Sequence, residues 1–494
     1  RTEILYRTPL RGIIFDRNMQ VLAGVFYRPA FIVFPELIED RVGMERFLAA
    51  FPPNYTNIYT NIDQTSFQSI PPEILNDPGI ATIMQPVRYD PKQLATHVIG
   101  YLNTSNITGI SGIEKTCDSY LRSGNTGIIA SFIDARRMPY KGLGVRWVQD
   151  GEGPMSNIVL TIDRNIQKLV EEAMDTSISK GAIVIMDPRN GEILAMASRP
   201  SFSPNDISDS INMSSSPMIN RAISSYPAGS ILKTVVAAYG LEKDIVTLSD
   251  KFYDPGFIDV GSLRFNCYLH PSGGHGWISF LDAMAYSCNP VFIEIALKIG
   301  GKNLLDFYET LGFGATTGVG LPFEQPGNLF SPHCISPQDT ANMAIGQGKI
   351  LVTPLQVAKL FSIIANGGKN VSPRLIAKIE SRAGELVKHL EPAIQERILS
   401  QDTCRQITFM LESVTRWGTA KSGWVDNYGS CGKTGTAETG HTQLDGSPIY
   451  HAWFGGFTPL ENPLFVIVVF VEEGGSGGDV ASPIFKAIAD KLLQ

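Results

Sequence analysis

The chain has 494 residues, of which 43% are hydrophobic and 18% are charged, a composition typical of a globular protein with two or three domains. Its net charge of −7 and the lack of a basic stripe disfavour nucleic acid as a partner. No apolar stretch reaches the roughly 18 residues that a membrane span needs. Six cysteines without a Cys-x-x-Cys pair are too few for a disulfide scaffold.

The N-terminal part of the chain contains short mixed segments with turn signals and no long amphipathic helix, which predicts a strand-rich domain. Residues 141–157 are rich in glycine and polar residues, as in a linker or a long turn. We therefore expect a domain boundary near residue 155, with a first domain over 1–155 and a second over 156–494.

The second part of the chain carries clearer signals. Apolar spacing predicts helices over 166–174, 230–243, 280–285, 291–299 and 483–493, and apolar runs predict strands over 181–186, 192–197, 452–457 and 464–471. The Asp-Pro-Arg-Asn-Gly segment 187–191 indicates a hairpin between the first two strands. Strands at both ends with helices between them favour one α+β domain whose sheet is completed by the C-terminal segment.

A first candidate for catalysis is the segment 230–233, Ser-Ile-Leu-Lys, which follows a turn and opens a predicted helix. Because positions i and i+3 share a helix face, the Lys233 amine can approach the Ser230 hydroxyl. Burial in an apolar helix lowers the pKa of a lysine, and a lysine with a lowered pKa can serve as a general base. The pattern alone is short, and the segment 177–180, Ser-Ile-Ser-Lys, fits it too.

Two further segments carry polar groups in suitable places. The segment 287–290, Ser-Cys-Asn-Pro, predicts a tight link between two helices, with Asn289 as the cap of the second; taken alone, an N-cap explains it. The segment 433–436, Lys-Thr-Gly-Thr, precedes the two C-terminal strands. On a sheet edge it suits an extended peptide whose carboxylate meets Lys433 and Thr434, whereas an exposed turn is the plain alternative.

In this order and context, Ser-x-x-Lys, Ser-x-Asn and Lys-Thr-Gly are the active-serine signature of penicillin-binding proteins and class A β-lactamases. The chain resembles a class B (monofunctional) penicillin-binding protein, a peptidoglycan D,D-transpeptidase, over essentially its whole length. Met19 stands where this family usually has glycine. Further matching segments are 11–18 (Arg-Gly-Ile-Ile-Phe-Asp-Arg-Asn), 97–101, 112–114, 220–222, 344–348, 353–356 and 453–456.

The resemblance implies the architecture and the setting. The fold would be α+β, with a penicillin-binding/β-lactamase-like transpeptidase domain (an antiparallel sheet between helices plus a helical subdomain) over 156–494. A strand-rich, non-catalytic pedestal domain would precede it over 1–155. The resemblance also implies a bacterial cell-membrane protein with a single N-terminal anchor, absent from this chain, and a catalytic domain outside the cytoplasm. A membrane glycosyltransferase of the wall machinery would be a partner, and acylation would require no cofactor.

The resemblance also implies roles for the motif residues. Ser230 would attack the penultimate D-Ala carbonyl of a stem peptide ending in D-Ala-D-Ala, Lys233 would take its proton, and Ser287 would relay that proton to the leaving amine. Asn289 would hold the substrate amide, and the N–H groups of Ser230 and Thr436 would form the oxyanion hole. A neighbouring amine would then attack the acyl-enzyme, whereas β-lactam antibiotics would stall at that stage. Lys433 would be a further catalytic residue, which with Thr434 and Thr436 binds the terminal carboxylate and keeps positive potential near Lys233. The substrate-binding residues would be Thr434, Gly435 and Thr436.

Other functions remain open from the sequence. The enzyme could hydrolyse β-lactams or act as a D,D-carboxypeptidase, or the protein could be a β-lactam sensor or a scaffold for a glycosyltransferase. A pedestal domain disfavours a β-lactamase, which needs only the catalytic fold. The intact Ser230, Lys233, Ser287 and Lys433 disfavour a pure scaffold.

A second candidate site contains Cys267, His275 and Cys288, with Asp254 or His270 as a fourth ligand. Two cysteines and a histidine this close in sequence could hold a structural zinc ion, although the spacing is no standard zinc pattern. A Cys267–Cys288 disulfide and a pair of free buried thiols are the alternatives. Because Cys288 lies inside the Ser-x-Asn segment, any of these states would touch the candidate active site.

Overall fold

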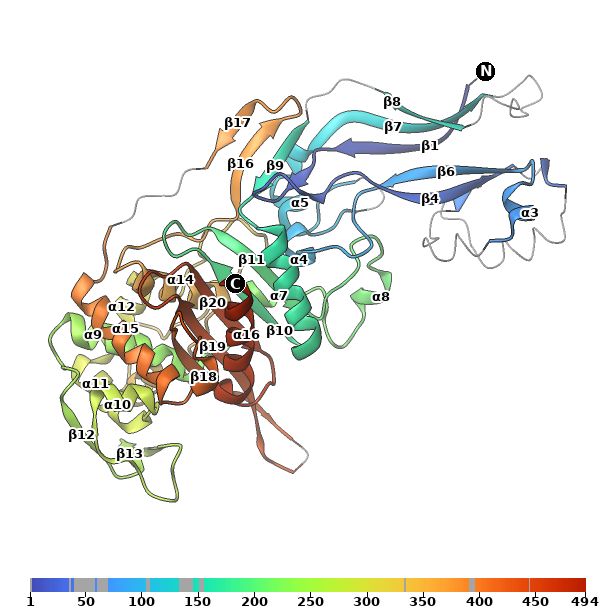
Figure 1. The fold of residues 1–494 in the computed structure, drawn as a ribbon. Coiled ribbons are helices and arrows are strands. Elements are labelled where there is room, and N and C mark those ends of the chain that lie inside the picture. The colour runs from blue at the N-terminus through green and yellow to red at the C-terminus, as the bar shows by residue number, and fades with distance from the viewer. Residues whose placement is uncertain are drawn as a thin grey trace.

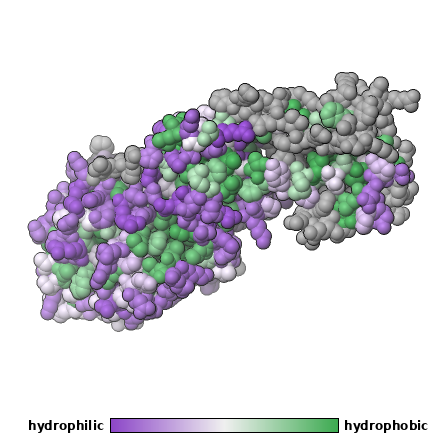
Figure 2. Space-filling view, turned by 45° about the horizontal axis from the view of Figure 1, so that its top comes forward, coloured by the Kyte–Doolittle hydropathy of each residue, from purple (hydrophilic) through white to green (hydrophobic). Residues whose placement is uncertain are grey.

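The computed structural model describes residues 2–34, 37–39, 58–59, 70–103, 107–132, 145–150, 155–332, 335–390, 396–443 and 445–494. The described parts form a large lobe, which carries most of the helices, and a narrower strand-rich arm (Figure 1). The N-terminal end lies far out on the arm, and the C-terminal end lies on the large lobe. Figure 2 shows the same elongated outline, with hydrophilic residues surrounding an apolar area on the visible face of the large lobe. Within the described residues, no helix has the length and apolar character required to cross a bilayer.

The arm consists mainly of two three-stranded antiparallel sheets, of order β1-β7-β8 and β5-β4-β6. Short helices at its base lie next to the large lobe (Figure 1). The elements are β1 (Thr2–Arg11), β4 (Phe26–Val33), β5 (Ile58–Tyr59), α3 (Pro72–Leu75), β6 (Ile80–Val87), α4 (Thr96–Ile99), α5 (Gly112–Thr116), α6 (Asp118–Leu121), β7 (Arg122–Phe132) and β8 (Val145–Asp150). The prediction of a strand-rich N-terminal region is confirmed.

Strand β8 corrects one expectation from the sequence. It lies inside the segment 141–157, which was predicted to be a linker or a long turn, and it pairs with β7 from Val145 opposite Ser131 to Asp150 opposite Thr126. Its sequence, Val-Arg-Trp-Val-Gln-Asp, contains residues that favour strands. Glycines and polar residues on both sides of this short strand favour a turn, so the sequence of the whole segment predicts a linker.

A five-stranded sheet joins the arm to the large lobe, in the order β17-β16-β9-β2-β3. Strand β2 pairs in parallel with β9, so segments from both sides of residue 155 share one sheet. Asp16, which follows β2, is fully buried and accepts a hydrogen bond of 3.0 Å from the Arg164 amide at the start of α7. The elements are β2 (Ile14–Phe15), β3 (Val21–Ala23), β9 (Ser156–Leu160), α7 (Arg164–Ser177), β16 (Ile376–Ser381) and β17 (Leu386–His389).

The centre of the large lobe is a five-stranded antiparallel sheet of order β11-β10-β20-β19-β18. The predicted hairpin at 187–191 joins β10 to β11, and the C-terminal strands complete the sheet, so the α+β prediction is confirmed. The strands are β10 (Gly181–Met186), β11 (Ile193–Arg199), β18 (Cys431–Thr442), β19 (Pro448–Thr458) and β20 (Phe465–Val471). Strand β18 lies at the edge and carries the Lys-Thr-Gly segment.

Helices cover both faces of this sheet. On β19, Phe454 packs against Phe485 of α16, with ring centroids 4.7 Å apart, whereas the next residue, Gly455, lies against Phe361 of α14. Because successive residues of a strand point to opposite faces, α16 and α14 lie on opposite sides of the sheet. The covering elements are α7, α14 (Pro354–Ala365), α15 (Gln401–Arg416), η5 (Gly477–Ala481) and α16 (Ser482–Leu492).

The remaining helices form a subdomain beside β18 (Figure 1). Two predicted helices have shifted starts. The helix expected over 230–243 begins at Lys233 after a 3-10 turn, and Cys288, not Asn289, occupies the N-cap of α11. The elements are η3 (Gly229–Leu232), α9 (Lys233–Glu242), β12 (Lys251–Asp254), β13 (Phe257–Val260), β14 (Leu263–Asn266), β15 (Gly276–Ser279), α10 (Phe280–Ala285), α11 (Asn289–Ile299), α12 (Gly301–Thr310) and α13 (Pro337–Ile345), with the short elements α8 (Ser208–Ile211), η2 (Arg221–Ile223) and η4 (Lys421–Gly423) elsewhere in the lobe.

Candidate active site

The turn that carries Ser230 is fixed on two sides. The Trp453 side chain on β19 is fully buried and donates a hydrogen bond of 3.0 Å to the Pro227 carbonyl, and the Gly229 amide donates to the Gly346 carbonyl at 3.0 Å. Gly229 has a φ of 58°, a left-handed conformation that glycine adopts without a steric penalty. Ser230 follows in η3, half-buried, one turn before Lys233.

The Ser230 turn packs directly against β18. A Cβ atom on Gly435 would lie 2.3 Å from the Ala228 carbonyl oxygen, and a Cβ on Gly229 would lie 2.7 Å from the Thr436 carbonyl oxygen. Only glycine allows two backbones to approach this closely. The glycine of the Lys-Thr-Gly segment therefore brings Ser230 beside the sheet edge.

Lys233 is fully buried and holds the Ser-x-Asn segment. Its Nζ donates to the Ser287 carbonyl at 2.6 Å, to Ser287 Oγ at 3.1 Å and to Asn289 Oδ1 at 2.6 Å. Burial lowers the pKa of Lys233 to about 7, because a charged ammonium loses its hydration there. A large fraction of this amine is therefore neutral near neutral pH.

A second buried lysine shares the same hydroxyl. Lys433 on β18 is fully buried, and its Nζ donates to Ser287 Oγ at 2.9 Å and to the Thr434 carbonyl at 3.3 Å. Burial, and then the nearby Lys233 charge, lower the pKa of Lys433 well below its usual value. Ser287 Oγ thus bridges the two amines, and a charge on Lys233 disfavours the charged form of Lys433.

The Ser287 backbone turns sharply between α10 and α11, with a φ of 57°. The Ser287 amide donates to the Met284 carbonyl at 3.1 Å, and the Asn289 side chain donates to the Asn266 carbonyl at 2.9 Å. The predicted tight link between two helices is therefore present. It directs the Ser287 hydroxyl and the Asn289 amide toward Lys233.

Two supporting residues on the β18 side gave no recognisable sequence signal. Thr419 Oγ1 lies 3.0 Å from Thr434 Oγ1, and the Gly477 amide donates to Thr436 Oγ1 at 3.2 Å. Gly477 belongs to a glycine-rich segment, which is the one feature that could have marked it. Thr436 itself is exposed at the sheet edge.

The structure brings the three motifs into one place. Lys233, Ser287, Asn289 and Lys433 are joined by hydrogen bonds, and the Ser230 turn packs on residues 435 and 436. The competing segment 177–180 lies at the end of α7, where Lys180 pairs with Glu473. A serine, a buried lysine of lowered pKa and a sheet edge that carries a second lysine together suit acyl transfer from a peptide that ends in a carboxylate.

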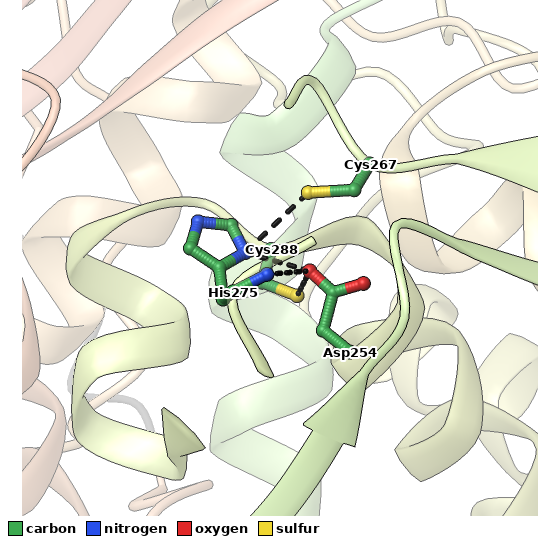
Figure 3. A group of neighbouring side chains, drawn as sticks. All are labelled: Asp254, Cys267, His275 and Cys288. Atoms are coloured by element: carbon green, nitrogen blue, oxygen red, sulfur yellow. Dashed lines mark hydrogen bonds and ion pairs between the residues drawn. The ribbon is translucent and has the colours of Figure 1, made fainter. Parts of the chain in front are cut away.

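The second candidate site includes Cys288, the residue that follows Ser287 in the chain (Figure 3). The ligand atoms of Asp254, Cys267, His275 and Cys288 all lie within 4.8 Å of one another. Asp254 Oδ2 is 2.7 Å from His275 Nδ1 and accepts from Cys288 Sγ at 3.2 Å, and Cys267 Sγ is 3.4 Å from His275 Nδ1. The four side chains come from β12, two loops and the N-cap of α11.

The electrostatics of this cluster favour an anionic Asp254 and an anionic Cys267, whereas the pKa values of Cys288 and His275 are raised. Burial raises the pKa of Asp254, but hydrogen bonds from the His275 side chain and from the Gly256 and His275 amides outweigh it and lower the pKa to about 2. A hydrogen bond from Cys288 lowers the pKa of Cys267 to about 5. Both cysteines are free thiols in the structure. His270, the alternative fourth ligand, is exposed and is not in the cluster.

Residues 181–490 match the family model described as "Penicillin binding protein transpeptidase domain". The chain is 32% identical to "Stage V sporulation protein D" of Bacillus subtilis, covering 96% of this chain and 77% of that protein. It is 28% identical to "Peptidoglycan D,D-transpeptidase MrdA" of Acinetobacter baumannii, covering 97% of this chain and 80% of that protein.

The fold of the whole chain also has a solved counterpart. A chain from the structure described as "Structural coordination of polymerization and crosslinking by a peptidoglycan synthase complex" superposes with a TM-score of 0.76 at 26% identity. The match covers 99% of this chain and 90% of that chain. The similarity therefore includes the arm as well as the large lobe.

Proposed function

Because this chain belongs to the penicillin-binding protein transpeptidase family, we propose that it cross-links peptidoglycan by serine acyl transfer from stem peptides ending in D-Ala-D-Ala. The observation that carries the proposal is the bridge from Lys233 through Ser287 Oγ to Lys433, set beside the Ser230 turn. In this arrangement Lys233 would be the base, Ser287 the proton relay and Lys433 the carboxylate-binding cation, all beside the turn that carries Ser230. Its relatives named as peptidoglycan D,D-transpeptidases support the reaction class.

In the acylation step, neutral Lys233 takes the Ser230 proton while Ser230 Oγ attacks the carbonyl carbon of the penultimate D-Ala. The C–N bond then breaks, and the proton returns through Ser287 Oγ to the departing D-Ala amine. Ser287 suits this relay because its oxygen lies 3.1 Å from Lys233 Nζ and 2.9 Å from Lys433 Nζ. General acid–base catalysis of this kind typically contributes about 10²–10⁴-fold to a rate.

The substrate lies along β18, which has a free edge in the sheet order. Lys433, Thr434 and Thr436 would bind the terminal carboxylate, and Gly435 would keep the strand close to the Ser230 turn. Asn289 would hold the substrate amide. The N–H groups of Ser230 and Thr436 would stabilise the oxyanion, and the loss of one such donor typically costs about 10²–10³ in rate.

In the second step, an amine of a neighbouring stem peptide attacks the Ser230 ester, forms the cross-link and regenerates the hydroxyl. A β-lactam opens on Ser230 in the same way, but its ring-derived leaving group stays attached and blocks the acceptor amine. Hydrolysis is the competing fate of the ester. It would make the enzyme a D,D-carboxypeptidase or a β-lactamase instead.

The partners and the location follow from the substrate. Peptidoglycan lies outside the cytoplasm, so we place the catalytic lobe there, on a protein anchored in the bacterial cell membrane. The similarity to a peptidoglycan synthase complex supports a membrane glycosyltransferase as a partner. A sensor or scaffold role is less well supported, because it would not require the Lys233–Ser287–Lys433 bridge.

The reaction is tested with a stem pentapeptide donor and a labelled D-amino acid acceptor, with products identified by mass spectrometry. Wild-type protein should release D-Ala and form the labelled peptide, and Ser230→Ala should form neither. Ser177→Ala is the matched control, because Ser177 begins the competing Ser-x-x-Lys segment on the surface. Release of D-Ala without any labelled product would show a carboxypeptidase, and full activity in Ser230→Ala would refute the proposed nucleophile.

A structural zinc ion is the second part of the proposal. Asp254, Cys267, His275 and Cys288 provide one oxygen, one nitrogen and two sulfurs, all of which are zinc ligands, and these atoms lie within 4.8 Å of one another. The lowered pKa values of Asp254 and Cys267 favour the anionic ligands that zinc binds. Four protein ligands leave no open position, so the ion would brace the Ser287 link without entering the chemistry.

The zinc content of purified protein tests this assignment. We expect about one zinc ion per chain in the wild type, none in Cys267→Ala, and full content in the control Cys404→Ala, whose buried cysteine is outside the cluster. Intact mass under non-reducing conditions detects the alternative. A metal-free protein two hydrogens lighter than its reduced form would show a Cys267–Cys288 disulfide and refute the zinc proposal.

A further inference from the structure

A cavity of about 430 Å³ lies where the arm meets the large lobe, separate from the residues assigned to catalysis. The arm contributes His97 from α4 together with Ser111 and Gly112 at the start of α5. The large lobe contributes Phe202, residues within 218–226 and residues within 321–325. Its volume falls in the usual range of small-molecule sites.

The lining of the cavity carries no formal charge. No Asp, Glu, Lys or Arg is among the described residues that line it, and burial lowers the pKa of His97 to about 4, so that its ring is neutral. The His97 ring is further held by a contact of 2.7 Å between Nε2 and the Pro217 carbonyl. A lining of this kind disfavours phosphate, carboxylate and ammonium groups inside the cavity, because no charged side chain of the described lining compensates a buried charge.

The cavity combines aromatic rings with neutral hydrogen-bonding groups. Phe202, Tyr226 and Phe323 provide the rings. Gln325 Oε1 accepts from the Ser225 amide at 2.7 Å, so its side-chain N–H groups remain as donors within the described contacts. The other neutral polar side chains in the lining are Ser111, Asn220, Ser224 and Ser225. Aromatic surface with neutral donors and acceptors suits a sugar, whose C–H faces pack on rings while its hydroxyl and amide groups form hydrogen bonds.

The conformation and exposure of Phe323 indicate that the cavity binds a ligand. Its side chain is 71% exposed, and its backbone has a φ of 66°, a conformation that a bulky residue rarely adopts. The Lys115 Nζ of α5 lies 4.5 Å from the centre of one face of the ring. Exposure of a large apolar ring in an unfavourable backbone conformation is typical of a ligand clamp.

We propose that this cavity binds an N-acetylhexosamine unit of a peptidoglycan glycan strand. The proposal rests on the proposed function, since that polymer is the one the enzyme would cross-link. Ring faces would pack on the pyranose, and Met218, Ile219 and Leu321 would receive the acetyl methyl group.

The wall of the cavity is continuous in the chain with the turn that carries Ser230, the proposed nucleophile. Residues 218–226, which contribute to its wall, continue without a break into Pro227 and the Ser230 turn. The wall is held to the rest of the lobe by the backbone pair between Tyr226 and Val352, at 2.9 Å in both directions. A glycan strand held here is anchored to the same segment that presents Ser230, so it favours donors attached to glycan over free peptides.

Binding is tested with N,N′-diacetylchitobiose by saturation-transfer NMR on the full chain after acylation with penicillin, which blocks Ser230. We expect transfer to the acetyl methyl groups, and about tenfold weaker binding in Phe323→Ala because a stacking face is lost. Phe409→Ala removes another exposed aromatic ring, on α15, and should leave binding unchanged. Cellobiose, which lacks acetamido groups, should bind less well.

A kinetic comparison separates this proposal from the proposed function. Phe323→Ala should raise KM for glycan-linked donors about tenfold and leave kcat, KM for a free pentapeptide and penicillin acylation unchanged. No transfer to the sugar, equal binding by Phe323→Ala, or equal binding of cellobiose would overturn the sugar assignment while leaving the acyl transfer intact. Stronger binding of N-acetyl-tryptophan amide than of the sugar would assign the cavity to a side chain of a protein partner and would also overturn it.

Discussion

At the scale of single residues, the proposed chemistry depends on two buried lysines whose pKa values are both lowered. Lys233 and Lys433 are fully buried and share Ser287 Oγ. Burial lowers the pKa of both amines, and the charge of Lys233 lowers the pKa of Lys433 further. Lys233 lies one turn after Ser230 and is our proposed base, whereas Lys433 lies on the strand that would receive a carboxylate. Residue type and spacing alone suggest this division of roles, but the shared hydroxyl is visible only in the structure.

The pH dependence of acylation follows from the pKa of Lys233. This pKa is lowered to about 7, so the neutral base is depleted below it and saturates above it. We expect the rate of penicillin acylation to rise about tenfold per pH unit below neutrality and to level off above about pH 7. Stopped-flow or quenched mass spectrometry between about pH 5 and pH 9 measures this profile. A midpoint near the value of an exposed lysine would contradict a buried base.

At the scale of elements, the Ser230 turn packs against β18 with no room for a side chain at Gly435. Gly435→Ala would place a methyl group 2.3 Å from the Ala228 carbonyl, which forces the strand and the turn apart. We expect acylation to fall at least about tenfold and the free energy of unfolding to fall by about 1–3 kcal/mol. Penicillin acylation rates and chemical denaturation measure the two effects.

Glu438→Ala is the control, since this exposed residue lies on the same strand. It should retain both acylation and stability. If Gly435→Ala also acylated at the wild-type rate, the close approach of the two backbones would not matter for the reaction.

Much of this element-level picture could be predicted from the sequence. The structure confirms the strands predicted at 181–186 and 464–471 and the turn predicted at 187–191. The two strand segments are recognisable because their residues are apolar throughout, and the turn is recognisable because its Asp-Pro-Arg-Asn-Gly sequence favours a hairpin. Strand β8 was missed because its short apolar signal lies between glycine-rich flanks.

The contacts within the site were less predictable than the elements that carry them. The three motifs were expected to come together, and their hydrogen-bonded geometry is present. Thr419 and Gly477 support β18 from distant segments, and no local pattern marks such long-range partners. For the cluster around Asp254, residue type and closeness in sequence predict Cys267, His275 and Cys288 but leave Asp254 and His270 as alternatives, and the structure places Asp254 with the other three.

At the scale of the whole molecule, the arm and the large lobe share structure across the predicted boundary at residue 155. The parallel pairing of β2 with β9, the core contact of Ile14 and the bond from the Arg164 amide to Asp16 all cross it. A bond from the Ala95 amide to Glu171, at 2.7 Å, adds a second connection. The division into domains over 1–155 and 156–494 stays a prediction, and these contacts couple the two parts energetically.

We therefore expect the arm and the large lobe to unfold together in one cooperative thermal transition. Asp16→Ala leaves the Arg164 amide and the Asn18 and Gln20 amides without their acceptor, so it should destabilise the protein by about 1–3 kcal/mol. Differential scanning calorimetry should show the single transition moving to a lower temperature. Asp209→Ala, at an exposed aspartate, is the control. Two separate transitions, with only one displaced by Asp16→Ala, would contradict the coupling.

The central claim is that Ser230 forms the acyl-enzyme, and intact mass after brief exposure to a penicillin tests it most directly. The wild type should carry a single penicillin adduct that persists for hours after the free drug is removed, as expected of a transpeptidase whose acyl-enzyme resists water. Ser230→Ala should carry none, and Ser177→Ala should behave as the wild type. An adduct that disappears within minutes would indicate a β-lactamase, and an adduct on Ser230→Ala, or none on the folded wild type, would contradict the account.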